Sequence, residues 1–469
     1  MVRTRFAPSP TGELHIGGLR SALYAYALAK HSDGSFILRI EDTDQKRKVE
    51  GATERIYGIL ETFGLIWDEG PKKGGLHSPY VQSERVGLGV YRDRADELLG
   101  KGLAYYCFCA PEIRKEVKAK EGRGIPALRD PCREVDRSLA ENRIKKGELA
   151  AVRLKVPSGI RVGFYDEVAK REVFWDSDHL DDAMLLKSDG FPTYHLAVVT
   201  DDLDMKITHV LRGHDWLSST PVHLLIYRFL EKNPPKFFHL SDILDPGGGK
   251  LSKRKGAFSC EQLLRQGYLP EAIINFVMLL GWAPKNNREL FSLSEFIEVF
   301  DGEGLQKSNP AFNQDKLDWF NGIYIRKKSD AELAELIDKL VGDRIKGGVR
   351  TIKIVPLIRD RVSKLSDFDS LAGFFYEAPP LQKEGFSRLG VSHLNSAMKI
   401  VSTTAFDVES LGTGFKSEIN NNKYKTGDFF MDLRLAITGK KITPPITESI
   451  ALLGVEETKK RLMRAMESF

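Results

Sequence analysis

Strand-like segments and helix-spaced apolar residues alternate along the N-terminal part of the chain. We interpret Val2–Ala7 as a short buried strand and Ser35–Ile40 as a second strand. After each of these segments, apolar residues recur at helical spacing, the first time from Gly17. The residues that carry this spacing are Leu19, Ala22, Leu23 and Tyr26, then Ile56, Ile59, Leu60 and Phe63. The strand–helix order predicts a parallel, doubly wound sheet, in which ligands bind at the carboxyl ends of strands.

The pattern changes in the middle of the chain and then returns. Residues 86–192 mix a helical stretch, a cysteine-containing segment and strand-like runs at Ala151–Val156 and Glu172–Trp175. We interpret them as an insertion that splits one domain. That domain resumes at Thr193–Ala197 and contains a strand at Ile207–Leu211, and the chain is mostly helical from Pro270. The expected class is α/β: a Rossmann-like parallel-sheet domain with an inserted domain, followed by all-α C-terminal domains. The expected domain ranges are 1–85, 86–192, 193–240, 241–325 and 326–469.

Composition narrows the class of protein. At 469 residues the chain is too long for one core, and 42% hydrophobic with 29% charged residues excludes a disordered protein. No apolar run approaches the roughly 20 residues that cross a bilayer, so we expect no membrane association. The N-terminus enters a strand at once, which predicts no signal peptide. Four cysteines are too few for a disulfide scaffold and indicate a reducing cytoplasm. The net charge of +5 is weak evidence for nucleic-acid binding.

Two motifs are suited to gripping a nucleotide triphosphate. His15, Gly17 and Gly18 fall at a strand-to-helix turn, where glycines admit phosphate oxygens and the helix start offers free amides. Far downstream, three glycines precede a basic loop that could close over phosphates and stabilise pyrophosphate as it leaves. Its cations are Lys250, Lys253, Arg254 and Lys255. The alternatives are a plain tight turn beside a surface histidine and a solvated basic loop. The pairing of the two motifs favours the nucleotide site, although the Walker pattern does not occur.

Four further residues suit an amino-acid site, and we expect them at strand ends of the split domain. They are Arg5, Glu41, Tyr194 and Arg212. Arginine binds a carboxylate bidentately, so two arginines around one pocket suit an amino acid whose side chain is also acidic. Glu41 would bind the ammonium group. The alternative for each charged residue is an ordinary surface salt bridge.

Five ordered motifs together resemble those of the bacterial-type glutamyl-tRNA synthetases, which are class I enzymes. They are RFAPSPTGELHIGG at Arg5–Gly18, RIEDTD at Arg39–Asp44, FPTYHLA at Phe191–Ala197, HVLRGHDWLSSTP at His209–Pro221 and KLSKRKG at Lys250–Gly256. The resemblance continues through LPEAIINFVMLLGW, FNQDKLDWFNGIYI and the C-terminal helices, and so covers essentially the whole chain.

The resemblance implies ATP-dependent ligation of L-glutamate to the 3′ end of tRNA(Glu) through a glutamyl-adenylate, with AMP and pyrophosphate released. The first step is expected to need bound tRNA, and Mg²⁺ is expected on the phosphates. By motif position the catalytic residues are His15, Lys250, Lys253 and Arg254, and ATP contacts His15, Gly17, Gly18 and Lys253. The glutamate site comprises Arg5, Ser9, Glu41, Tyr194 and Arg212. A monomer is the family's usual form. We expect a cytoplasmic location, with an organellar protein whose leader has been removed as the alternative.

The resemblance also assigns the domains. It implies that 1–85 and 193–240 are the two halves of the catalytic domain and that 86–192 binds the acceptor end of tRNA. It further implies that 241–325, with the KLSKR loop, contacts the tRNA stem and that 326–469 binds the anticodon.

The chain departs from the family's pattern at several places. Gly18 and His214 stand where many relatives carry a histidine and an acidic residue, and Val198 stands where some carry an asparagine. Cys107, Cys109 and Cys132 resemble the zinc-binding insertion of some relatives, but Leu128 replaces a tyrosine that helps complete that site. Three thiolates leave a tetrahedral site incomplete, so we expect no metal, with zinc completed by a distant histidine as the alternative.

Other functions remain as alternatives. A non-discriminating enzyme would also charge tRNA(Gln), a choice that a few anticodon-contacting side chains make. A glutamyl-queuosine tRNA modifying enzyme lacks the helical tail that this chain has, and a glutaminyl-tRNA synthetase carries a β-barrel C-terminal half. A catalytically inactive tRNA-binding paralogue is disfavoured by the intact His15, Lys253 and Arg212.

Overall fold

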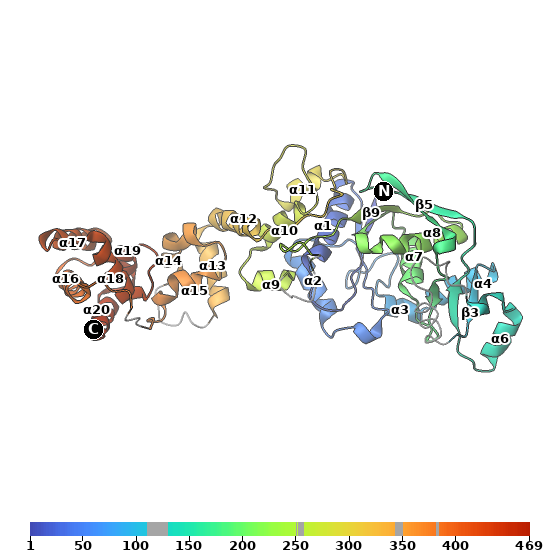
Figure 1. Ribbon diagram of the computed structural model, residues 1–469, viewed down its shortest axis with the longest axis horizontal. Helices are drawn as coiled ribbons and strands as arrows, with labels where there is room; N and C mark the ends of the chain where they lie inside the picture. The colour runs from blue at the N-terminus through green and yellow to red at the C-terminus, as the bar shows by residue number, and fades with distance from the viewer. Residues whose placement is uncertain (110–129, 250, 252–257, 343–349, 381–383) are drawn as a thin grey trace. The chain divides into compact units, whose positions relative to one another are not determined.

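The protein consists of two compact units. A computed structural model describes residues 1–109, 130–249, 251, 258–342, 350–380 and 384–469 (Figure 1). One unit comprises residues 1–262 with 274–313, and the other comprises residues 263–273 with 314–469. The first unit contains both β-sheets, and the described residues of the second form helices and their connections.

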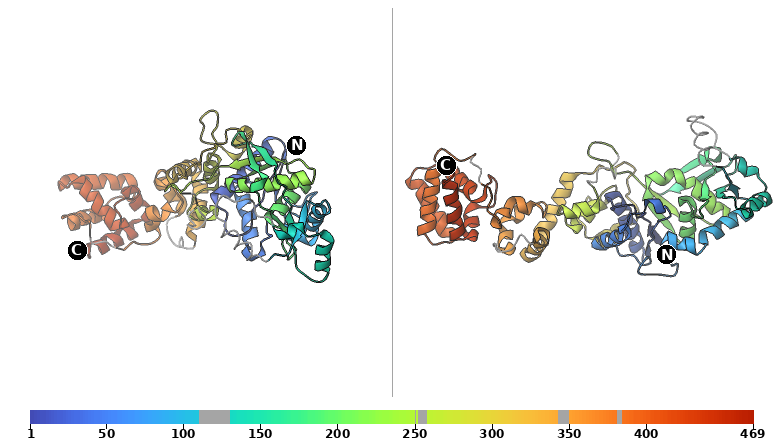
Figure 2. Two further views of the ribbon diagram at one scale, coloured as in Figure 1. Left: turned by 45° about the vertical axis from the view of Figure 1, so that its right-hand side comes forward. Right: turned by 90° about the horizontal axis from the view of Figure 1, so that it is seen from below.

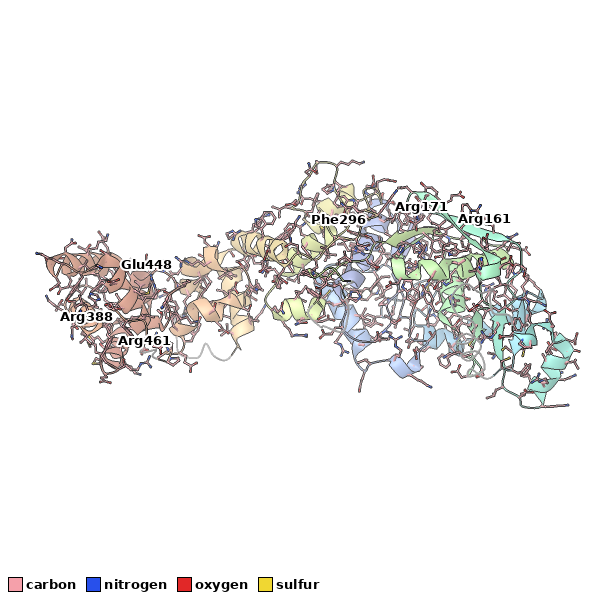
Figure 3. The ribbon with its side chains drawn as sticks, viewed as in Figure 1. Arg161, Arg171, Phe296, Arg388, Glu448 and Arg461 are labelled. Atoms are coloured by element: carbon pink, nitrogen blue, oxygen red, sulfur yellow. The ribbon has the colours of Figure 1, made fainter. Side chains whose placement is uncertain are left out.

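Six strands form the main sheet of the first unit, in the order β2-β1-β8-β9-β5-β6. They are β1 (Arg3–Phe6), β2 (Ser35–Leu38), β5 (Arg161–Asp166), β6 (Arg171–Asp176), β8 (His209–Gly213) and β9 (Lys236–Leu240). The strands from β2 to β5 in this order are parallel to their neighbours, with β5 joined to β9 through the pair Asp166↔Phe237. β6 is the antiparallel partner of β5, and Figure 3 labels Arg161 and Arg171, which begin these two strands.

Helices cover both faces of the sheet. The main ones are α1 (Ile16–His31) on one face, and α7 (Tyr194–Asp204) and α8 (Thr220–Phe229) on the other. Adjacent residues of β2 point to opposite faces, as in any strand. Phe36 meets Tyr26 of α1 edge-on with ring centroids 5.4 Å apart, whereas Ile37 lies in the core that α7 and α8 complete. Figure 1 shows α7 and α8 alongside β5 and β9. A parallel sheet covered on both faces confirms the predicted α/β class.

The N-terminal elements lie where the apolar pattern places them, and one residue differs. The strands predicted at 2–7, 35–40 and 207–211 correspond to β1, β2 and β8, and the predicted helices correspond to α1 and α2 (Ala52–Thr62). Tyr194, expected at a strand end, instead begins helix α7. The residues that follow it, Leu196 to Val199, are all buried in the core, and this packing overrides the strand preference of the two valines.

The segment 86–192 contributes to two sheets. A three-stranded antiparallel sheet is formed by β3 (Ala104–Cys107), β4 (Ala151–Leu154) and β7 (Met184–Leu186). Helices α3 (Gln82–Gly87), α4 (Val90–Gly100) and α6 (Arg137–Lys145) accompany it. The β5–β6 hairpin, by contrast, extends the main sheet. Through this hairpin the segment 86–192 places Asp166, the last residue of β5, beside β9.

Helices make up the rest of the chain. In chain order they are α9 (Cys260–Arg265), α10 (Pro270–Met278), α11 (Leu293–Val299), α12 (Gln314–Lys327), α13 (Asp330–Val341), α14 (Thr351–Ile358), α15 (Asp367–Ala372), α16 (Gly390–Thr403), α17 (Val408–Asn421), α18 (Thr426–Thr438), α19 (Ile446–Leu453) and α20 (Val455–Met466). The last five surround one core and form the bundle coloured red in Figure 2. Arg461 of α20, labelled in Figure 3, ties the bundle by donating to the Ile437 carbonyl at 2.8 Å. Of the helices in the described parts of the chain, none has the length and apolar composition needed to cross a bilayer.

Candidate active site

The start of α1 is built by the histidine and glycines of the first motif. His15 is the N-cap residue, and its Nδ1 accepts a hydrogen bond from the Gly17 amide at 3.0 Å. A Cβ atom at Gly17 would lie 2.7 Å from His15 Cε1, and one at Gly18 would lie 2.6 Å from Leu14 Cδ1. A side chain at either position would therefore displace the side chain of His15 or Leu14, and the imidazole of His15 lies against the helix start, where the helix dipole is positive.

Backbone hydrogen bonds join the first motif to residues that follow the basic motif. The Ile16 amide donates to the Phe258 carbonyl at 3.2 Å, and the Cys260 amide donates to the Leu14 carbonyl at 2.8 Å. At the start of the basic motif, the Leu251 amide donates to the Ile243 carbonyl at 2.9 Å. The described residues that flank the basic motif are thus fixed in the same unit as His15. The candidate cations Lys250, Lys253, Arg254 and Lys255 themselves lie outside the described residues.

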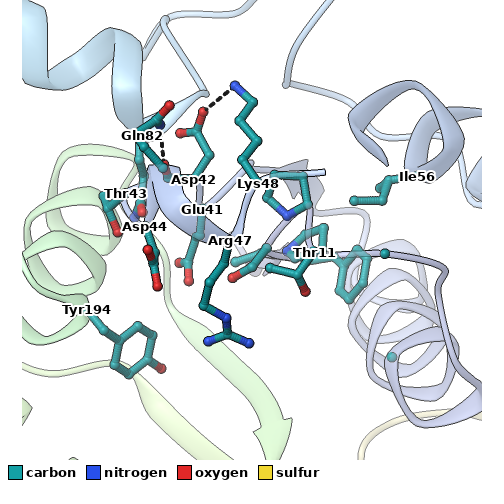
Figure 4. A pocket seen from close by; sticks show the side chains of 18 of the residues that line it. Thr11, Glu41, Asp42, Thr43, Asp44, Arg47, Lys48, Ile56, Gln82 and Tyr194 are labelled. Atoms are coloured by element: carbon teal, nitrogen blue, oxygen red, sulfur yellow. Dashed lines mark hydrogen bonds and ion pairs between the residues drawn. The ribbon is translucent and has the colours of Figure 1, made fainter. Parts of the chain in front are cut away.

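One cavity of about 870 Å³ gathers most of the predicted site residues. It is lined by Arg5, Ser9, His15, Gly18, Glu41, Tyr194 and Arg212, among others. Gly17 is the one described candidate outside this lining, since its amide faces the His15 ring. Figure 4 shows Glu41, Arg47 and Tyr194 extending into the same part of the cavity. The strand-end positions of Arg5, Glu41 and Arg212 explain the convergence, because β1, β2 and β8 are neighbours.

Arg212 is a buried cation surrounded by neutral acceptors. Only 6% of it is exposed, and it donates to Tyr194 Oη at 3.3 Å, His223 Nδ1 at 3.3 Å, Thr220 Oγ1 at 2.7 Å and His239 Nε2 at 3.1 Å. Among the described residues, no carboxylate lies within ion-pair distance of it. Burial lowers the pKa of Arg212, and the opposing effects of Tyr194 and the more distant Asp202 do not offset the desolvation. A buried cation in a cavity wall is a binding site for an anionic group of a ligand.

Arg5 has the opposite environment, since its charge is already paired. Its Nε contacts Asp202 Oδ1 at 3.2 Å, and the same oxygen accepts from Arg39 at 2.6 Å. Arg39 is completely buried and also contacts Glu41 at 2.9 Å. Burial raises the pKa of Glu41, and the two arginines oppose this rise without cancelling it. Asp202 therefore fixes Arg5 and Arg39, which in turn place Glu41 at the cavity.

Several residues of the site have no predicted role. Arg47 and Trp216 line the cavity, and the centroids of the Trp216 and Tyr194 rings are 4.1 Å apart. Asp202 and His239 are buried behind the lining and reach it through arginines. Trp216 belongs to the motif at His209–Pro221 and Arg47 follows the motif at Arg39–Asp44, so both could have been proposed. His239 and Asp202 could not, because their roles depend on which distant residues they meet.

The three cysteines of the insertion do converge. Their sulfur atoms lie within 4.8 Å of one another, and the Sγ atoms of Cys109 and Cys132 are 3.6 Å apart. Burial, together with hydrogen bonding to Cys132, raises the pKa of Cys109 to about 12. The position of Leu128 lies outside the described residues. The cluster offers three soft ligands, which is a partial set for zinc.

Sequence comparison agrees with this architecture. The family model for the catalytic domain of class I tRNA synthetases for glutamate and glutamine matches residues 1–319, and an anticodon-binding-domain model matches residues 323–466. The protein is therefore a class I aminoacyl-tRNA synthetase.

Relatives narrow the class further. The glutamate–tRNA ligase of Dehalococcoides mccartyi strain BAV1 is 40% identical, with 99% of this chain and 97% of that protein covered. That of Treponema denticola is 37% identical, with 99% of both covered. The crystal structure of a glutamate tRNA ligase from Elizabethkingia meningosepticum in complex with its amino acid is 34% identical, covers 99% of both chains and has a TM-score of 0.85. The chain belongs to the glutamate–tRNA ligases, which confirms the resemblance seen in its motifs.

Proposed function

We propose that the enzyme ligates L-glutamate to the 3′ end of tRNA(Glu) in two steps within the cavity described above. The observation that carries this proposal is Arg212, a buried cation with neutral partners in a cavity bounded by the His15 helix start. The side-chain carboxylate of glutamate supplies the missing counter-charge. Family membership supports the same reaction.

Arg5, Glu41 and Tyr194 complete the amino-acid site. Glu41 binds the substrate ammonium, Tyr194 borders the side chain beside Arg212, and Arg5 with Ser9 faces the remaining polar groups. Because Arg5 is shared with Asp202, it contributes geometry more than net charge. The α-carboxylate stays free to react.

The adenylation step needs position and charge stabilisation but no covalent enzyme intermediate. An α-carboxylate oxygen of glutamate attacks the α-phosphorus of ATP, and the bond to pyrophosphate breaks. His15 donates to a phosphate oxygen, with Gly17 and Gly18 allowing the close approach of the helix start. Lys250, Lys253 and Arg254 neutralise the leaving pyrophosphate, and Mg²⁺ accompanies the phosphates. A terminal ribose hydroxyl of tRNA then attacks the glutamyl carbonyl, AMP leaves, and the proton of the hydroxyl passes to the AMP phosphate.

The tRNA contacts follow the proposed domain ranges. We assign the acceptor end to 86–192, the stem to 241–325 and the anticodon to 326–469, the last supported by the anticodon-binding model over 323–466. Cys107, Cys109 and Cys132 would be the ligands of a structural zinc ion. Because three ligands leave a tetrahedral site incomplete, we propose that the protein binds no zinc or binds it weakly. We also propose that the protein is cytoplasmic and monomeric. Light scattering of the purified protein tests the oligomeric state.

Pyrophosphate exchange into ATP tests the function. Exchange that requires both glutamate and tRNA is expected, and its absence under every condition would leave only a tRNA-binding paralogue. Replacing Arg212 with Leu should raise the KM for glutamate about 100-fold or more, since removing one partner of a buried pair costs about 3–5 kcal/mol. The KM for ATP should change little, and equal losses for both substrates would refute the assignment of Arg212. Charging assays on tRNA(Gln) decide whether the enzyme discriminates.

A further inference from the structure

A histidine and an aspartate stand behind Arg212 in a line of hydrogen bonds, here called the Arg212 relay: Arg212, His239 and Asp166. The Nε of Arg212 donates to His239 Nε2 at 3.1 Å, and His239 Nδ1 lies 2.6 Å from Asp166 Oδ2. The three residues come from β8, β9 and β5, which are adjacent in the sheet. All are buried, with 6%, 4% and 2% exposed.

The Arg212 relay favours one tautomer of His239. A guanidinium offers donors and no acceptor, so His239 Nε2 presents its lone pair to Arg212. The Thr220 hydroxyl lies 3.2 Å from the same nitrogen, accepts a hydrogen bond from Arg212 and is also within reach of the Trp216 carbonyl. The ring proton therefore resides on Nδ1 and is donated to Asp166. The Phe237 ring stacks on the imidazole with centroids 6.0 Å apart, and Phe164 meets it edge-on at 5.5 Å, so the ring orientation is also fixed.

Asp166 is itself held by the turn that follows β5. Its Oδ1 accepts from the Val168 amide at 3.0 Å and from the Ala169 amide at 2.7 Å. Only Oδ2 remains for His239. The position of the carboxylate is thus set by backbone amides, and the relay transmits that position to the guanidinium in the cavity wall.

We propose that His239 and Asp166 are positioning residues that orient Arg212 for the side-chain carboxylate of glutamate. The inference rests on the proposed role of Arg212. Neither residue lines the cavity or faces the proposed phosphate site at His15. Their effect is therefore confined to glutamate, and it reaches the substrate through the direction of one guanidinium.

The sharpest variant is Asp166→Asn, which is nearly isosteric. The amides of Val168 and Ala169 retain the Asn Oδ1, so the NH₂ group must occupy the place of Oδ2 and donate to His239 Nδ1. The imidazole proton then moves to Nε2 and opposes the Arg212 donor. We expect the KM for glutamate to rise about tenfold or more, as misplaced binding groups do, with the KM for ATP and the kcat at saturating glutamate nearly unchanged.

A matched pair at His239 separates the two hydrogen bonds. His239→Gln places a side-chain oxygen near the former Nε2 and keeps an acceptor for Arg212, whereas His239→Asn keeps a donor toward Asp166 and loses that acceptor. Glutamate affinity should fall more in His239→Asn than in His239→Gln.

The control is the variant Asp182→Asn. Asp182 is as buried as Asp166, accepts a hydrogen bond from the Val156 amide at 3.0 Å and pairs with Arg133, without contacting Arg212. It should leave the KM for glutamate unchanged at saturating tRNA.

Nitrogen NMR of the full chain with labelled histidine reads the tautomer directly. The signal that disappears in His239→Gln belongs to His239; it should report a neutral Nδ1–H ring in the wild type and an Nε2–H ring in Asp166→Asn. The proposal is overturned if the wild type carries its proton on Nε2, or if Asp166→Asn changes both KM values equally. If the wild type shows no glutamate-dependent exchange, the proposed function fails, while the tautomer still tests the relay.

Discussion

Gly17→Ala separates the position of His15 from the stability of the fold. Gly17 lies in the first turn of α1, where alanine is the better helix former by about 0.5–1 kcal/mol. The added Cβ would meet His15 Cε1 at 2.7 Å, against the 3.4 Å at which ordinary contacts begin. The imidazole must therefore retreat by about 0.7 Å, and its bond from the Gly17 amide, worth about 1 kcal/mol, weakens.

The expected result is a loss of activity without a loss of stability. The helix gain and the weakened hydrogen bond nearly cancel, so the thermal unfolding midpoint should stay close to that of the wild type. A displacement of that size at a group contacting the transition state lowers the rate by up to about 100-fold. Pyrophosphate exchange at saturating glutamate and tRNA measures that rate, and a calorimetric scan measures the midpoint.

Gly58→Ala is the matched control. Gly58 lies exposed in α2, and a Cβ there meets nothing within 4 Å, so this variant reports the helix preference alone and should keep full activity. If the Gly17→Ala variant exchanges pyrophosphate at the wild-type rate, His15 does not contact the reacting phosphates. A fall in exchange that matches a fall in the unfolding midpoint would also refute the reasoning, because activity would then follow stability.

Further predictions concern charges. Lys253→Ala should slow adenylate formation while sparing glutamate binding, because its contact strengthens as phosphate charge develops, and an unchanged exchange rate would remove Lys253 from the mechanism. Asp202→Asn leaves Arg5 and Arg39 without their shared anion and should cost about 3–5 kcal/mol of the free energy of unfolding of its unit; an unchanged denaturant midpoint contradicts this. Burial, with Arg212, lowers the pKa of His195 from 6.5 to about 4. The unfolded chain therefore binds the extra proton, and stability falls as the pH drops from about 6.5 toward 4. His195→Gln should flatten that slope in acid titrations followed by circular dichroism, and an identical slope would exclude His195 as its source.

The sequence predicts the framework of the first unit well because that framework is local. Strands β1 and β2 are short segments that precede stretches of clear helical spacing, so the local pattern is enough to place them. The contribution of β5 is not local: it joins the main sheet through one pair with β9, about 70 residues further along the chain, and β7 of the second sheet lies between them in sequence. Tyr194 shows the same limit, since a β-branched stretch becomes helical once the core surrounds it. Arg39 belongs to a conspicuous motif, yet its complete burial depends on Asp201 and Asp202, more than 160 residues away in sequence.

The distribution of charge in the cavity explains how one fold can select an acidic amino acid. Arg5 and Arg39 are balanced by Asp202 and Glu41, so together these groups provide shape and a site for an ammonium ion. Arg212 is left with neutral partners, and desolvation makes its charge costly until a carboxylate arrives. An uncharged side-chain amide would bring hydrogen-bond acceptors but no counter-charge, and so would leave that cost in place. We therefore propose that selectivity for glutamate follows from Arg212, which has no carboxylate partner among the described residues, more than from the number of arginines present.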